Sequence, residues 1–346
     1  GRLPRLRPPR HTGRGAAAAG AEARVEEPVR FTVAASGDLL IHGPVHQRAL
    51  LNGGGRRYDF RPMLRTVRGI VSPADLAICH LEVPLTNGTP SGWPSFRAPA
   101  ELAEAIRWTG WDACSTASNH SLDGGDSLVR FTIRALNRQR VSHSGTSLSP
   151  RGRPWTMLGA KGRKVAFLAY VHPGIPGVVR PPQRYLLHFA DAPRILADAR
   201  AARRAGADAV IVSVHWGTEY VHEPSAAQRA LASRLTRSPD VTAVIGQHVH
   251  VVQPVWRVNG KPVVFGEGNL LSNQTSACCV AASQDGMIAL LDMEVGPAGA
   301  RVRRVRYAPT WVRHPDFQVV RAPAESARRT AAVVESGGVA RGAAGP

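Results

Sequence analysis

Five strand-like runs of this 346-residue chain are followed by side chains that commonly bind metals, and this pattern limits the fold more than any other feature. In chain order these side chains are Asp38, His80 with Glu82, Asn119 with His120, His215, and His248 with His250. In α/β sheets, side chains beyond the carboxyl ends of strands converge on one crevice. One polar strand ending is ordinary, but five drawn from Asp, Glu, Asn and His predict a shared site.

Helical stretches alternate with these runs. The predicted strands span residues 30–38, 74–82, 112–120, 207–216 and 241–248, and the predicted helices span 58–74, 98–110, 125–140, 193–206 and 224–237. Hairpins are predicted at 154–171, turning at Lys161-Gly162, and at 255–265, turning at Asn259-Gly260. Two late strands are expected at 286–295 and 300–312. The alternation predicts one α/β domain with outer helices, and the hairpins predict mixed sheets.

The two ends of the chain differ from its middle. Residues 1–29 are rich in Pro, Gly, Ala and Arg and lack hydrophobic periodicity, so we expect a disordered basic linker there. We expect the folded domain over 30–320 and a C-terminal helix with a disordered tail over 321–346. No apolar run approaches the roughly 20 residues that a membrane span needs.

The net charge of +19 does not predict a specific nucleic-acid partner. Only Lys161, Lys164 and Lys261 are lysines, and the many arginines are scattered along the chain, as the codon bias of a GC-rich genome would produce. Attraction to an acidic polymer remains compatible with this charge.

The four cysteines do not form a metal-finger pattern. Cys79 and Cys114 lie in apolar runs and are interpreted as small buried side chains. Cys278 and Cys279 are adjacent in a predicted loop and are interpreted as ordinary thiols. Cysteine usage leaves the cellular compartment open.

Each candidate ligand also has an ordinary explanation when taken alone. Asp38 follows Ser-Gly as a turn residue would, and His215 could be a core histidine. His248 and His250 share one face of the chain, whether as ligands or as packing residues. Together the candidates form a mixed oxygen and nitrogen ligand set that suits Mn, Fe or Zn. Two such ions can stabilise both the attacking and the leaving oxygen of a phosphoryl group.

Six strings of this chain resemble the successive motifs of a known family. In order they are SGD, ADLAICHLEVPLT, TASNHSLDGG, VSVHWGTEY, IGQHVHVVQPV and FGEGNLLSNQ, within about residues 32–295. They resemble the bacterial capsule synthesis CapA family, which includes poly-γ-glutamate biosynthesis proteins and belongs to the calcineurin-like metallophosphatase superfamily. The resemblance implies a single-domain sandwich of two mixed β-sheets flanked by helices, with a centre for two divalent ions.

The resemblance also implies roles for individual residues. Asp38 and His250 would bind one metal, Glu82 would bridge, and the second metal would take Asn119, His215 and His248. His120 would meet the substrate or leaving group, with Glu219 and Asp123 as orienting or proton-transfer residues. Gln253 and Gly268-Asn269 match positions interpreted as shaping the pocket.

The chain departs from the family pattern at several positions. His80 stands where the family usually has asparagine, and it could add a ligand or lie behind the ligands. Ser118 and Val249 replace a usual asparagine and a usual proline, and Glu267 adds an unusual negative charge. His42 lies four residues after Asp38, so its coordination is an open question.

The predicted function is that of a metal-dependent hydrolase, phosphoesterase-like, in cell-envelope or poly-γ-glutamate metabolism. The alternative is a non-catalytic capsule-assembly or polymer-binding component with a structural metal site. The expected partners are an anionic polymer or phosphoester substrate and membrane-bound capsule machinery. The expected location is extracytoplasmic, with membrane or wall association through a segment upstream of Gly1.

Overall fold

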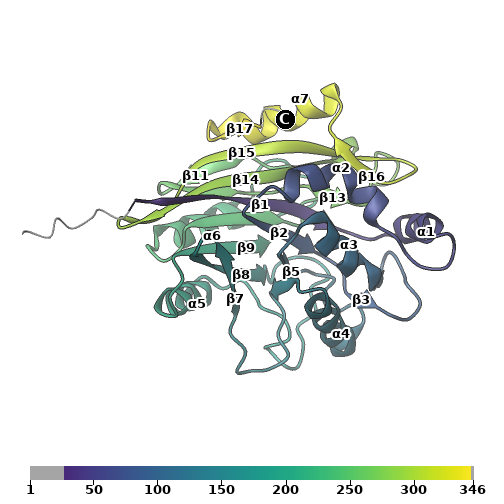
Figure 1. Ribbon diagram of the computed structural model, residues 1–346, viewed down its shortest axis with the longest axis horizontal. Helices are drawn as coiled ribbons and strands as arrows, with labels where there is room; N and C mark the ends of the chain where they lie inside the picture. Colours follow the sequence, from purple (N-terminus) through teal and green to yellow (C-terminus); the bar gives the residue numbers. More distant parts are fainter. Residues whose placement is uncertain (1–26, 344–346) are drawn as a thin grey trace, which may run out of the picture.

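Two β-sheets stack face to face and carry helices on their outer faces (Figure 1). The computed structural model describes residues 27–343. Nearly all of the predicted linker, 1–29, therefore lies outside the described residues. The expected α/β sandwich of two mixed sheets is confirmed.

The first sheet combines parallel and antiparallel strands. Its order is β16 (Gln318–Arg321), β15 (Gly299–Arg313), β14 (Asp285–Gly296), β1 (Val29–Leu39), β2 (Leu76–Leu81), β5 (Ala113–Ser115) and β6 (Ser142–Ser144). β13 (Asn269–Leu271) pairs with β1, and β17 (Ala340–Gly342) pairs with β15. β1, β2, β5 and β6 run parallel, so their carboxyl ends meet at one edge of the sheet.

The second sheet has a parallel centre and antiparallel borders. Its order is β11 (Val255–Val258), β12 (Lys261–Val264), β10 (Ala243–Gln247), β9 (Ala209–His215), β8 (Arg163–Val171) and β7 (Trp155–Ala160). Both predicted hairpin turns form here. Lys161-Gly162 and Asn259-Gly260 all have positive φ, as tight two-residue hairpins require. The short strands β3 (Leu85–Thr86) and β4 (Ala98–Pro99) pair separately.

In the described part of the chain, every helix except α1 overlaps a predicted helical stretch. The helices are α1 (Gly43–Asn52), α2 (Arg61–Val71), α3 (Glu101–Thr109), α4 (Gly125–Arg138), α5 (Ala192–Arg204), α6 (Ala226–Arg237) and α7 (Ala324–Val334), with single 3₁₀ turns η1 (Ala281–Gln284) and η2 (Glu335–Gly337). Local chemistry sets their ends. Ser225 and Gln228 form a capping box at the start of α6, and Gly110, at φ 115°, ends α3.

Strand alternation divides the apolar side chains among three layers. Val33 of β1 and Ile211 of β9 meet between the sheets, whereas Ala34 faces the layer that includes α2 and α3. Val210 and Val212 face α5 and α6 on the other side. Because successive residues of a strand point to opposite faces, each buried strand is apolar on both sides.

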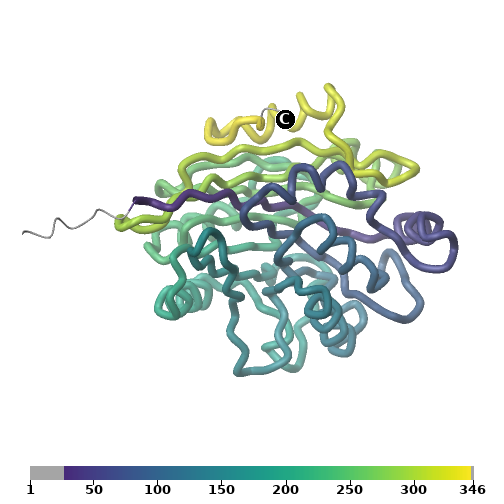
Figure 2. Tube along the Cα trace, viewed as in Figure 1, coloured from purple at the N-terminus to yellow at the C-terminus, as the bar shows by residue number. Residues whose placement is uncertain are grey.

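Segments far apart in the sequence complete the first sheet. Figure 2 shows the start of the purple β1 beside the yellow-green β14, and Val29 pairs with Val295. Residues 340–342, which we expected in a disordered tail, form β17 instead, because the fully buried Ala340 packs between the sheets and its backbone pairs with β15. Among the described residues, no helix combines the length and apolar character of a membrane span.

Cys79 and Cys114 are buried as expected, and they are also joined in a disulfide. The two residues are direct neighbours across the parallel strands β2 and β5. The sequence interpretation missed this bond, because only the pairing of β2 with β5 brings the two sulfurs together and that pairing is not visible in the sequence. The disulfide ties together the strands that lead to Glu82 and Asn119.

Candidate metal centre

The polar strand endings meet at one edge of the sandwich. Asp38 lies in β1, Glu82 directly follows β2, and His215 ends β9. Asn119 follows β5, and His248 and His250 follow β10. All six side chains are buried, and Asn119, at 9% exposure, is the most accessible of them. Parallel strands from two sheets therefore bring the six predicted ligands together.

Asp38 and His250 form the best-defined pair. His250 Nδ1 lies 3.0 Å from Asp38 Oδ2. Burial alone would lower the pKa of His250, but the charges of Glu82 and Asp38 and this hydrogen bond raise it to about 9. Burial alone would raise the pKa of Asp38, but His250 holds it below its usual value. A proton thus stands between the two side chains in the absence of another cation.

Glu82 is fully buried, yet neither of its carboxylate oxygens has a hydrogen-bond partner. Its Oε1 lies 3.8 Å from His250 Nε2 and 4.0 Å from His215 Nε2. Burial and the neighbouring charge of Asp38 raise the pKa of Glu82 well above its usual value. A buried carboxylate without a partner is strongly unfavourable unless a cation lies beside it.

The backbone after β10 is strained where it presents the two histidines. His248 has φ 97° and His250 has φ 57°, in the left-handed region that residues with a side chain rarely adopt. Strain of this kind clusters at functional sites, where surrounding contacts hold it. Here the His248 N–H donates to Asp38 Oδ1 at 3.4 Å. The strain turns both imidazoles of the Gln-His-Val-His segment toward the carboxylates.

His215 connects Asn119 to His80. Its Nε2 lies 2.9 Å from Asn119 Oδ1, and its Nδ1 lies 3.0 Å from His80 Nε2. Burial lowers the pKa of His215 well below its usual value, that of His80 to about 4 and that of His248 to about 3. These rings are therefore neutral, which is the form that binds metals.

His120 and Asp123 form a separate acid–base pair at the rim. His120 Nδ1 lies 2.9 Å from Asp123 Oδ2, and the His120 side chain is 18% exposed. Phe96 packs edge-on against the imidazole at 4.6 Å, and its backbone N–H donates to Asp123. This clamp, which the sequence analysis missed, leaves the second ring nitrogen of His120 free of the pair. Glu219 lies exposed beside His248 and His250.

The residues interpreted as pocket-shaping hold the loops instead of lining open space. Gln253 Oε1 accepts from Gln228 Nε2 at 2.7 Å, and its Nε2 donates to the Val221 carbonyl. Asn269 contacts the centre directly, since its Oδ1 lies 3.1 Å from His250 Nδ1. Gly268 also supplies the carbonyl that accepts from the Asp38 N–H.

Three further residues, His80, His42 and Glu267, also lie near the centre. His80 is fully buried and its Nδ1 has no partner. His42 Nδ1 lies 3.0 Å from the Leu40 carbonyl oxygen, so this ring nitrogen already has a backbone hydrogen-bond partner. Glu267 is fully buried; Gln247 Nε2 donates to its Oε2 at 2.9 Å, and burial raises its pKa to about 8.

The donor set fits metal ions. Among the described residues, Asp38, Glu82 and His250 offer ligand atoms within 4.8 Å of one another, and so do Glu82, His215 and His248. Glu82 belongs to both groups. Carboxylates and neutral imidazoles are the ligands that Mn, Fe and Zn prefer. The unpartnered oxygens of Glu82 and the unpartnered Nδ1 of His248 are buried polar atoms that a metal would satisfy.

The sandwich has a metallophosphatase-like fold. The calcineurin-like phosphoesterase YfkN from Bacillus subtilis has the same fold, with a TM-score of 0.51 and 14% sequence identity over 88% of this chain and 96% of that chain.

The chain belongs to the family described as bacterial capsule synthesis protein PGA_cap, whose model matches residues 32–274. The PGA biosynthesis protein CapA of Bacillus subtilis is 26% identical over 50% of this chain and 46% of its own length. The capsule biosynthesis protein CapA of Bacillus anthracis is 22% identical over 71% of this chain and 60% of its own length. The chain thus spans about half the length of these curated relatives.

Proposed function

We propose that this protein is a metal-dependent hydrolase, phosphoesterase-like, that acts on an anionic polymer or phosphoester of the cell envelope, such as poly-γ-glutamate or a precursor. The observation that carries the proposal is Glu82. Its buried carboxylate has no hydrogen-bond partner and lies between the neutral His215 and the protonated His250, an arrangement that a bound divalent cation would stabilise.

Two divalent ions would be held by the six predicted ligands. Asp38, Glu82 and His250 would hold one ion, and Glu82, Asn119, His215 and His248 would hold the other. When bound, such ions polarise a phosphoryl or acyl oxygen and stabilise the negative charge of the transition state.

The remaining chemistry belongs to the rim residues. The Nδ1–H of His120 can donate to Asp123 while Nε2 carries a proton toward the leaving group. Asp123 fixes the orientation of the imidazole. Glu219, beside His248 and His250, can accept a proton at the opposite side of the centre. The burial of the six ligands keeps bulk water from competing for them.

The family and its relatives support a role at the cell envelope. Curated relatives carry the names PGA biosynthesis protein and capsule biosynthesis protein. The Cys79–Cys114 disulfide is a feature of oxidising environments, which supports an extracytoplasmic location. Membrane-bound capsule machinery is the partner we propose on these grounds.

Elemental analysis of the purified protein, paired with a hydrolysis screen, tests the proposal. We expect about two equivalents of transition metal. We also expect turnover of a phosphoester or of a γ-glutamyl polymer that is lost in H250A. Protein that binds metal but hydrolyses nothing in the screen would favour the assembly role. Purified protein that binds no transition metal would contradict both the hydrolase proposal and the alternative of an assembly component with a structural metal site.

A further inference from the structure

A pocket of about 870 Å³ opens beside β8. We call it the β8–α5 pocket. Its walls come from the segment around Ser147–Pro154, from the connection between β8 and α5, and from the start of α5. Tyr170 of β8 lines it, whereas the next residue, Val171, packs between the sheets and pairs with His215. The two sites therefore share the carboxyl end of β8.

One connection borders both sites. The His172 N–H donates to the carbonyl of His215 at 2.9 Å. A Cβ placed on Gly177 would lie 3.9 Å from Asn119 Nδ2, so the connection passes close to that predicted ligand. Three residues later, Arg180 reaches the β8–α5 pocket, followed by Arg184. The connection between β8 and α5 therefore contacts both the metal centre and the β8–α5 pocket.

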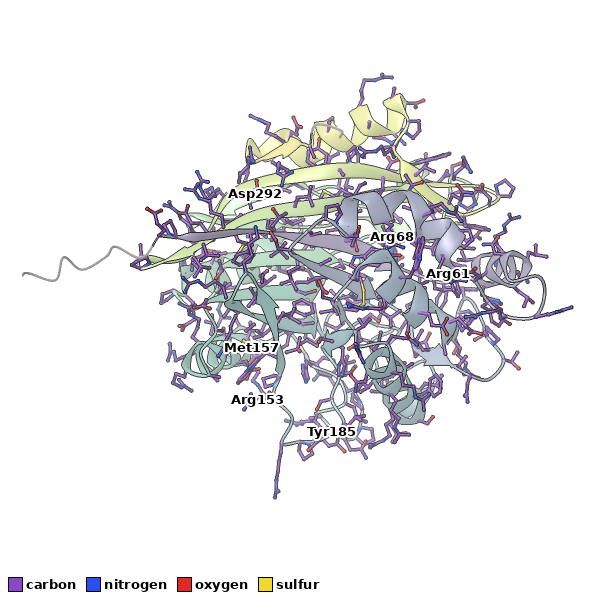
Figure 3. All side chains as sticks on the ribbon, viewed as in Figure 1. Arg61, Arg68, Arg153, Met157, Tyr185 and Asp292 are labelled. Atoms are coloured by element: carbon purple, nitrogen blue, oxygen red, sulfur yellow. A yellow bond between two sulfur atoms is a disulfide. The ribbon has the colours of Figure 1, made fainter. Side chains whose placement is uncertain are left out.

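Arginines surround the β8–α5 pocket without acidic partners. Among the described residues, none forms an ion pair with the exposed Arg180 or Arg184, or with Arg151 and Arg153 of the neighbouring loop. The Arg180 guanidinium lies 4.8 Å from the centroid of the Phe189 ring, which also lines the pocket. Figure 3 shows Arg153 and Tyr185 on the same side of the molecule.

The two carboxylates of the pocket wall already have partners. Asp191 caps α5 by accepting from the Arg194 N–H at 3.3 Å. Asp198 accepts from Tyr170 Oη at 3.0 Å and from Arg194 Nε at 2.8 Å. Arg194 offsets one of these two charges, and Arg180 and Arg184 together outweigh the other, so the lining carries a net positive charge. The pocket is suited to an anion.

His188 adds an independent sign of a ligand. It lines the pocket, and its Nδ1 is buried without a hydrogen-bond partner. The ring also hydrogen-bonds the Ala169 backbone, and burial lowers its pKa to about 4. A neutral ring that uses one nitrogen as donor keeps a lone pair on the other. That lone pair can accept from an amide N–H.

We propose that the β8–α5 pocket binds carboxylate groups of an amide-linked acidic chain, such as a γ-linked glutamate oligomer, while another part of the same chain lies at the metal centre. The unpaired arginines would bind the carboxylates, and His188 would accept from a linking amide. This inference rests on the proposed function, because it places the polymer substrate across both sites.

A fluorescent γ-linked glutamate decamer tests the proposal in full-length, chelator-treated protein, so that no hydrolysis is needed. We expect R180Q/R184Q to weaken decamer binding about tenfold, because two charge-assisted contacts are lost. The control R65Q/R234Q removes two exposed arginines that also lack ion pairs, from α2 and α6, and we expect less than about a twofold change. Unchanged thermal midpoints would show that the variants fold.

The decamer experiment tests the pocket separately from the proposed hydrolase activity. If R180Q/R184Q and R65Q/R234Q weaken decamer binding equally, or if the wild type does not bind the decamer, the pocket proposal is wrong. If inorganic phosphate displaces the decamer but unlabelled glutamate oligomer does not, the pocket binds phosphate and the proposed acidic-chain ligand is wrong. If the wild type binds the decamer at this pocket but hydrolyses nothing when loaded with metal, the hydrolase proposal is wrong and the pocket proposal still holds.

Discussion

Acidic side chains lie near both ends of strand β1. At one end they pair with arginines, and at the other they face histidines and amides. Near the start of β1, Asp292 and Glu294 lie beside arginines. The paired arginines at this end are Arg30, Arg301, Arg303, Arg304 and Arg306. At the other end of β1, Asp38, Glu82 and Glu267 are fully buried and face histidines and amides.

The difference appears in the pKa values. Burial alone would raise the pKa of Asp292, but hydrogen bonds from Arg306 and Arg304 hold it below its usual value. Burial instead raises the pKa of Glu82 well above its usual value. Arginine carries a permanent charge and satisfies a carboxylate completely, whereas a neutral histidine leaves room for a cation. The end without arginines is the end that can take a metal.

The largest effect is expected from Glu82→Gln. The loss of a shared ligand should remove bound metal and lower turnover by more than about 100-fold. The same substitution should raise the thermal midpoint of metal-free protein, because it removes a buried, unpartnered carboxylate. Metal analysis and calorimetry measure both changes. A metal-free E82Q protein less stable than the wild type would contradict our account of this site.

His120→Gln should lower turnover by about 100-fold, because general acid catalysis contributes at least that much. Metal content should stay at the wild-type level, since His120 lies at the rim and pairs with Asp123. Steady-state kinetics and metal analysis of the same preparation separate the two effects. Loss of metal in H120Q would show that His120 binds the metal and would contradict its proposed role in proton transfer.

Chelation should act on only one end of the sheet. A metal at 100 times its dissociation constant stabilises the folded state by about 2.7 kcal/mol, so EDTA should lower the thermal midpoint of the wild type. The E82Q variant should show no such shift. A chelation response of equal size in both proteins would place the stabilising metal elsewhere.

The smallest effect is expected at the arginine end. Asp292→Asn should destabilise the protein by up to about 1 kcal/mol at neutral pH, because these ion pairs are partly exposed. The folded-state pKa of Asp292 is lowered, so its contribution is complete above about pH 3.8 and is lost as the pH falls through the folded-state value. Urea unfolding at pH 7 and pH 3 measures this. A difference between the two proteins that grows toward pH 3 would contradict the sign.

Local patterns predicted much of the fold and of the candidate site. Hairpins at Lys161-Gly162 and Asn259-Gly260 follow from turn chemistry, and the clustering of the six predicted ligands follows from the polar endings of parallel strands. Helix α1 was not predicted, and the expected strand at 112–120 is only Ala113–Ser115, since residues 116–120 belong to a loop.

Contacts between distant strands could not be predicted. The Cys79–Cys114 bond depends on the neighbouring positions of β2 and β5. The contact of His80 with His215 crosses from one sheet to the other. No local periodicity carries that information, because it arises only when the two sheets stack.

The length of β1 also has a consequence for orientation. Val29 begins this strand at the arginine end, and Asp38 lies nine residues further along it. At about 3.3 Å per residue, roughly 30 Å separates the two positions. The start of β1 therefore lies at the pole of the sandwich opposite the metal centre (Figure 1). A probe attached at Val29 would report on that pole without touching the predicted ligands.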